Sequence, residues 1–97
     1  MAEQQDPTFF ERADAHIGLA NQQATTIAGP RVAASMSFAT ARYNAYLCAN
    51  MYGNAAEMQR QREDAIRRLT EHYNKMLQDS FDDFITNFDT YSRPAGQ

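Results

Sequence analysis

The chain is poor in cysteine, tryptophan, proline, glycine and β-branched residues. It contains one cysteine, no tryptophan, three prolines and four glycines, and Val32 is its only valine. Because a single cysteine, Cys48, cannot form an intramolecular disulfide, we expect a reducing compartment such as the cytoplasm. The shortage of β-branched residues beside abundant alanine, glutamine and arginine favours helices over strands.

The charge and hydropathy patterns argue against nucleic-acid binding and membrane insertion. The net charge is −3 and the pI is about 5.2, whereas nucleic-acid-binding domains usually present a basic face. The first residues lack the basic and apolar regions of a signal peptide. Residues 32–52 are long enough to cross a bilayer, but they include Arg42, Asn44 and Asn50. We therefore expect a soluble protein whose partners include neither nucleic acid nor membrane.

What the chain has is helical periodicity, which predicts an all-α fold with three long helices and one short C-terminal helix. The predicted helices cover about residues 7–27, 30–53, 55–78 and 80–91, within one helical domain over residues 7–91. The first is marked by apolar residues three or four positions apart, and Asp6 or Thr8 can cap it. We expect residues 1–6 and 92–97 to be disordered.

The segment over residues 30–53 is predicted to be the central helix of a small bundle. It has apolar residues on two opposite sides, and its only charges are Arg31 and Arg42. A helix that is apolar on both sides is normally buried on both sides. We therefore expect neighbouring helices, or a second copy of the chain in a homodimer, to cover it.

The last third of the chain predicts a helix break at Gln78–Ser80. An apolar stripe that includes Met58, Leu69 and Met76 is followed by a second stripe, which is shifted by one residue: Leu77, Phe81, Phe84, Phe88 and Tyr91. Ser80 can cap a new helix with Asp82 and Asp83 in its favourable first turn. An unbroken helix over residues 55–91 would instead be roughly 55 Å long, and its overhang would need a partner chain.

No residue pattern predicts catalysis, a metal ion or another cofactor. His16 and His72 lie on different helices, and neither follows a glutamate by three residues, as a bundle di-metal site requires. Cys48 has no neighbouring histidine or lysine that would lower its pKa by local sequence. We therefore expect a protein that is not an enzyme and uses no cofactor.

Arg42 is the residue that most needs an explanation in a buried helix. An unpaired guanidinium is too costly to bury, so we expect it to pair with a carboxylate or to extend into water. Asp14, and Asp82 or Asp83, are candidate partners in an ion pair. The alternative is a polar pocket for a small molecule or anion, lined by Arg42, Tyr43, Asn44, Asp14 and His16.

Several short motifs together resemble a proteobacterial family known as domain of unknown function 3144. They span about residues 9–91 and comprise Phe9–Asp14, Ile17–Asn21, Ala41–Ala45, Phe81–Ile85, Asn87–Asp89 and Tyr91. The resemblance implies a bacterial, all-helical, stand-alone protein. It brings no activity, cofactor or catalytic residue.

The leading hypothesis is a non-enzymatic module that binds another protein or itself. The chain has eleven phenylalanine and tyrosine rings, which exceed what one small core is expected to cover, and aromatic residues are enriched in protein interfaces. We expect Phe10, Phe84 and Ile85 to remain outside the core and to form the interaction surface. The small-molecule pocket around Arg42 is the alternative.

Overall fold

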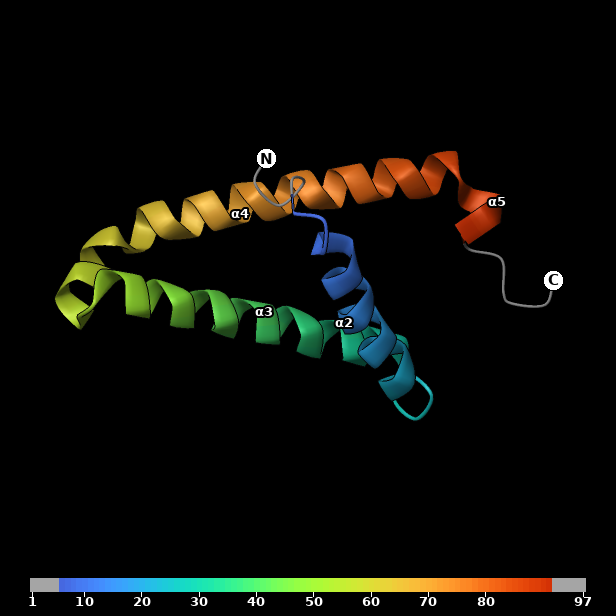
Figure 1. Cartoon of the computed structure of the whole chain (residues 1–97), viewed down its shortest axis with the longest axis horizontal. Helices are drawn as coiled ribbons and strands as arrows, with labels where there is room; N and C mark the ends of the chain where they lie inside the picture. The colour runs from blue at the N-terminus through green and yellow to red at the C-terminus, as the bar shows by residue number, and fades with distance from the viewer. Residues whose placement is uncertain (1–5, 92–97) are drawn as a thin grey trace. The chain divides into compact units, whose positions relative to one another are not determined.

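The computed structural model describes residues 6–91, and it confirms the all-α fold. The helices are α2 (Phe9–Gln23), α3 (Gly29–Tyr52), α4 (Ala55–Thr86) and α5 (Phe88–Tyr91) (Figure 1). No β-strand occurs in this part of the chain. Three long helices and a short C-terminal one were predicted, but the end of the first helix and the boundary between the last two differ from the prediction by four and eight residues.

Contacts within the chain divide it into two units, residues 1–47 and 48–97. The first contains α2 and most of α3, and the second contains the end of α3 together with α4 and α5. The single helical domain predicted over residues 7–91 stays a prediction. The predicted disorder of residues 1–5 and 92–97 lies outside the described residues.

The start of α2 is held by Asp6, which we had expected to be disordered. The Asp6 carboxylate accepts hydrogen bonds from the backbone N–H and the hydroxyl of Thr8, both at 2.9 Å, and it forms an ion pair with Arg12. The hydrogen bond from Arg12 and those from Thr8 lower the pKa of Asp6 to about 2. These contacts take the place of a side-chain cap by Thr8, which α2 lacks.

The end of α2 lies four residues before the predicted boundary at Ile27. After Gln23 the chain forms a turn in which the hydroxyls of Thr25 and Thr26 donate to the carbonyl oxygens of Gln22 and Gln23, at 2.7 and 3.4 Å. Threonine side chains that bond to nearby backbone groups compete with helical hydrogen bonding. Two consecutive threonines therefore end the helix before Gly29 does.

The connection between α3 and α4 follows the sequence prediction. Gly53 has a φ of 86°, in the left-handed region that glycine adopts without steric cost at a helix C-terminus. The Asn54 side chain then caps α4 by accepting a hydrogen bond of 2.8 Å from the backbone N–H of Glu57. Two residues are enough to end one helix and begin the next.

The predicted break at Gln78–Ser80 is wrong, because α4 continues through these residues to Thr86 (Figure 1). The segment from Lys75 to Thr86 contains neither glycine nor proline, and a Lys75–Asp79 ion pair of 2.7 Å spans the expected break. The helix ends instead at Asn87, whose side-chain amide donates to the carbonyl oxygen of Asp83 at 3.1 Å. At 32 residues, α4 is about 48 Å long.

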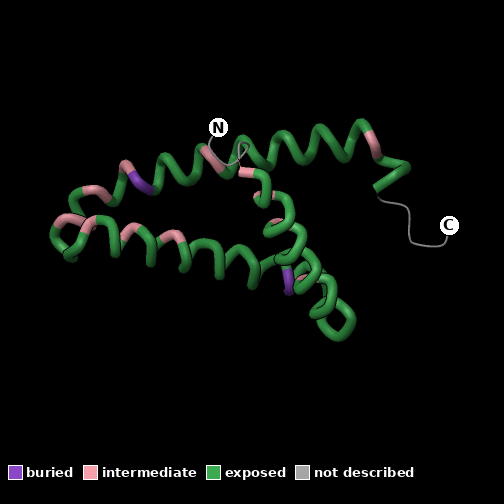
Figure 2. The backbone as a smooth tube through the Cα atoms, in the orientation of Figure 1, coloured by how far each residue is buried: buried purple, intermediate pink, exposed green. Residues whose placement is uncertain are grey.

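Few side chains are buried within the part of the chain that the structure describes. Val32 and Ala65, at 5% and 7% exposure, are the only buried residues among residues 6–91 (Figure 2). In α3 the large side chains of Phe38, Tyr43, Tyr46, Leu47 and Met51 are all exposed. A helix with two apolar sides needs cover on both, and the covered, central position of this helix stays a prediction.

Candidate functional site

One broad apolar surface follows the length of α4 and continues onto α5. Its residues, which we call the α4 face, are Ile66, Leu69, Tyr73, Met76, Leu77, Phe81, Phe84, Ile85, Phe88 and Tyr91, and all of them are exposed. The sequence showed two stripes shifted by one residue, which corresponds to about 100° around a helix. Because α4 is unbroken, the two stripes form adjoining parts of one face.

The short helix α5 contacts the end of α4 through an aromatic ring pair. The rings of Phe84 and Tyr91 pack with their centroids 4.7 Å apart, at an interplanar angle of 53°. Asn87 separates the two helices, but this ring contact keeps Tyr91 beside Phe84. The α4 face therefore extends past the end of the helix that carries most of it.

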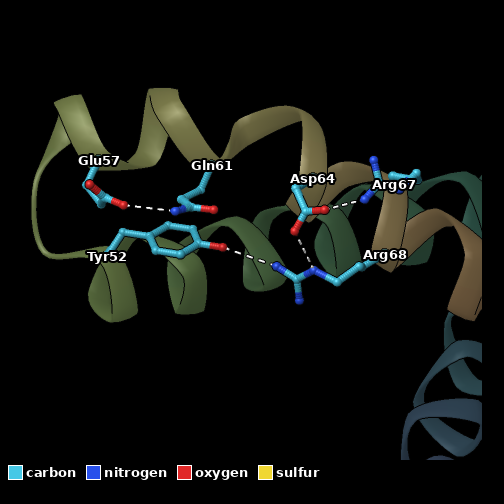
Figure 3. A network of polar contacts seen from close by, with 6 residues as sticks. All are labelled: Tyr52, Glu57, Gln61, Asp64, Arg67 and Arg68. Atoms are coloured by element: carbon cyan, nitrogen blue, oxygen red, sulfur yellow. Dashed lines mark hydrogen bonds and ion pairs between the residues drawn. The ribbon is translucent and has the colours of Figure 1, made fainter.

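A network of polar contacts connects the end of α3 to the first half of α4 (Figure 3). Arg68 donates from Nε to Oδ2 of Asp64 at 3.0 Å and from Nη2 to the Tyr52 hydroxyl at 3.3 Å. Asp64 also forms an ion pair with Arg67. Arg68 therefore links two helices that adjoin a two-residue turn, and it does so with polar groups that remain exposed to water.

The same network makes the Asp64 carboxylate a stronger acid than usual. The hydrogen bond from Arg68 lowers its pKa below the ordinary 3.8, and the charges of Arg67 and Arg68 lower it further. An aspartate with a lowered pKa stabilises the folded state above the unfolded value, and that contribution is lost as the pH falls through the folded value. The network is therefore intact at neutral pH and is lost in acid.

Replacing Arg68 by glutamine is expected to return the pKa of Asp64 toward 3.8. The substitution removes the hydrogen bond that lowers this pKa most. The measurement is an NMR titration of the Asp64 side-chain carboxyl carbon. Arg62→Gln is the matched control, since Arg62 forms an ion pair with Glu63 and not with Asp64. An unchanged Asp64 titration in Arg68→Gln would show that the Arg68 contact does not form in solution.

The five residues of the predicted polar pocket are not joined to one another. Asp14 and His16 lie in α2 and Arg42, Tyr43 and Asn44 in α3, and within residues 6–91 no hydrogen bond or ion pair links any two of them. All but Asn44 are exposed. Arg42 is exposed, so its side chain is in water, which is one of the two alternatives expected for it, and a guanidinium in water needs no carboxylate partner. The ligand-binding role stays a prediction.

The three residues of the predicted interaction surface are all exposed. Phe10 is 68% exposed in α2, where its ring packs edge-on against Phe9, and Phe84 and Ile85 are 51% and 70% exposed in α4. Their role in binding stays a prediction. Phe81, Phe88 and Tyr91 were not named for this surface, although the sequence analysis had placed them in one apolar stripe with Phe84, and all three are exposed.

Neither a metal site nor a transmembrane helix occurs in the part of the chain that the structure describes. No group of three or more histidine, cysteine, aspartate or glutamate side chains is placed to hold a metal ion there. None of the described helices is both long and apolar enough to cross a membrane. Cys48 is a half-buried free thiol.

Comparison with known proteins identifies the family of the chain. The searches of curated proteins and of solved structures found no match to the chain. The family model described as "Protein of unknown function (DUF3144)" matches residues 9–85, a range that contains α2, α3 and nearly all of α4. Because the match covers more than half of the sequence, the chain belongs to the DUF3144 family.

Proposed function

We propose that this protein is a non-enzymatic helical module that binds another protein chain through the α4 face. The observation that supports the proposal is the exposure of large apolar side chains in an unbroken row, with Phe81 62% and Phe84 51% exposed. Contiguous apolar patches of this kind on a soluble domain mark protein interaction sites. Aromatic rings, which dominate this face, are enriched at the centres of such interfaces.

The opposite side of α4 has the character of a surface that stays in water. It carries ion pairs within the helix, among them Asp64–Arg68 at 3.0 Å and Lys75–Asp79 at 2.7 Å. Ion pairs between exposed groups contribute little to stability but keep a surface hydrated. The contrast between the two sides fits a helix that presents one face to a partner.

The proposal places the module in the bacterial cytoplasm. The single cysteine, Cys48, supports a reducing compartment because it leaves the chain without an internal disulfide. The motifs that resemble the proteobacterial family support a bacterial source. The same motifs include Phe84 and Ile85, two residues of the α4 face.

The test is site-specific photocrosslinking in the cells that produce the protein. A photoreactive phenylalanine derivative at position 84 is expected to give a covalent adduct with a protein chain, which mass spectrometry identifies. The matched control places the same residue at Glu71, which lies on the side of α4 opposite to the α4 face. Adducts that are equally frequent at both positions, or absent at position 84, would refute the proposed function.

A further inference from the structure

The C-terminal end of the α4 face carries a carboxylate beside two aromatic rings. The Asp83 carboxylate accepts a hydrogen bond of 2.9 Å from the Asn87 side-chain amide. It also lies against the hydroxyl of Tyr91, whose ring packs on Phe84, and the charge of Asp83 together with this hydrogen bond raises the pKa of Tyr91 above its ordinary 10.0. Asp83, Phe84 and Tyr91 therefore form one exposed group, which we call the acidic corner.

Asp83 differs from the two aspartates that precede it in the groups that bind it. Asp79 forms an ion pair of 2.7 Å with Lys75. The hydrogen bond and charge of Asp79, and less strongly the charge of Asp82, raise the pKa of Lys75 above its ordinary 10.5. The amide and the phenol that bind Asp83 are neutral. Because a carboxylate has about four lone-pair sites, Asp83 can accept a charged donor in addition to these two.

The end of α4 favours a positive charge at the same place. Asp83 lies in the last four residues of this helix, which has no basic residue in its last turn. The free carbonyl groups of a last turn form the negative end of the helix dipole, where a carboxylate is unfavourable and a cation is stabilised. Residues 76–91 contain four aspartates and no lysine, arginine or histidine. A positive charge that another molecule brings to this end is therefore favourable.

The two rings of the acidic corner can contact the same cation. Lysine and arginine are attracted to the faces of phenylalanine and tyrosine rings, and their apolar stems pack on such surfaces. The rings of Phe84 and Tyr91 are inclined at 53°, and the two residues are 51% and 46% exposed. Neither ring covers the other, so both are accessible to a long basic side chain that reaches Asp83.

We infer that the α4 face binds a basic amphipathic helix of a different protein, and that a lysine or arginine of this helix occupies the acidic corner. The inference rests on the proposed function and states the chemistry of its partner. Apolar side chains of the bound helix cover the α4 face, as in other complexes of amphipathic helices with apolar surfaces. Its basic side chain provides the charge complementarity that makes such binding specific.

The charge of the chain selects this partner over the other candidates. The net charge of −4 over residues 76–91 repels nucleic acids, anionic membranes and acidic protein segments. The net charge of the whole chain is −3, so a second copy is also repelled at long range. A basic protein is attracted, and only a partner with apolar side chains can cover the rings.

The test is photocrosslinking in the cells that produce the full chain, with a photoreactive phenylalanine derivative at position 81. This position lies on the α4 face and leaves the acidic corner unchanged. Mass spectrometry identifies the crosslinked segment, which is expected to belong to a different protein and to contain lysine or arginine among apolar residues at helical spacing. A segment without a basic residue, or a second copy of this chain, would overturn the inference.

Asp83→Asn separates the charge of the acidic corner from its structure, since asparagine keeps an oxygen that accepts hydrogen bonds. The adduct yield is expected to fall on the order of tenfold, because hydrogen bonds to charged groups are the stronger ones. Asp79→Asn is the matched control: it makes the same change in net charge on the opposite side of α4, and it is expected to leave the yield unchanged. Equal yields from the two variants would overturn the inference.

Arg93→Gln tests whether the chain supplies the cation itself. Arg93 is the basic residue nearest to Tyr91 in the sequence, and it lies outside the described residues. We expect no change in the adduct yield when it is replaced. A higher yield would mean that Arg93 competes for the acidic corner, which would overturn the inference.

The two proposals fail in different ways. An adduct whose yield does not depend on Asp83 overturns the basic partner and leaves the interaction module in place. The absence of an adduct from both position 81 and position 84 refutes both proposals.

Discussion

Phe81→Pro is expected to lower the free energy of unfolding by about 3 kcal/mol, because position 81 lies in the interior of α4. Proline removes the backbone hydrogen bond to residue 77, and its ring collides with the carbonyl group of that residue. If a helix began after Ser80, as the sequence predicts, proline at its first position would be well tolerated. The measurement is chemical denaturation followed by circular dichroism at one protein concentration.

Phe81→Ala is the control that separates the backbone effect from loss of the ring. Both variants remove the exposed aromatic side chain, so their difference reports on helix continuity at this position. That difference is expected to be close to the full cost of an interior proline, about 3 kcal/mol. Equal stability of the two variants would mean that α4 is interrupted near Ser80 in solution.

Phe84→Asp is expected to weaken association through the α4 face at least about 30-fold, which corresponds to 2 kcal/mol. The substitution removes a ring from the apolar surface and places a carboxylate where the partner would exclude water. A buried, unpaired charge is among the most costly changes at an interface. The measurement is the yield of the covalent adduct formed by a photoreactive residue at position 81 in the same chain.

Gln78→Asp adds the same charge to α4 at an exposed position outside the α4 face. It is expected to leave the dissociation constant within a few-fold of the wild-type value, because charges at the rim of an interface contribute little. If the two aspartate variants associate equally well, the α4 face is not the binding surface. Far-UV circular dichroism of both variants checks that their helix content is unchanged.

Local sequence signals predicted the helices well where a single residue decides the backbone conformation. Gly53, with its positive φ, and Asn54, with its cap on Glu57, lie where the sequence placed them. The break at Ser80 was wrong because a serine followed by two aspartates is a helix-start signal only if the preceding helix has ended. Nothing in the segment from Lys75 to Thr86 ends it, and Lys75–Asp79 supports its continuation.

The candidate surface was predictable in part. Phe84 and Ile85 were expected to be exposed, and they are. Tyr73, Phe81 and Phe88 were not named for the interaction surface, because periodicity shows which side chains share a face but not what covers that face. The same limit applies to Arg42, for which the sequence left two alternatives open, a carboxylate partner or extension into water, and its side chain is exposed.

The sequence by itself determined the all-α class, the short turn after α3 and the apolar and polar sides of α4, because each depends on residues within one or two helical turns of each other. The tertiary structure decided that α4 is continuous and that Val32 and Ala65 alone are buried among residues 6–91. Burial depends on contacts between residues far apart in the chain, or on another chain. The apolar patterns of α3 and α4 therefore predict which sides of these helices need cover, but a pattern within one helix does not predict what covers it.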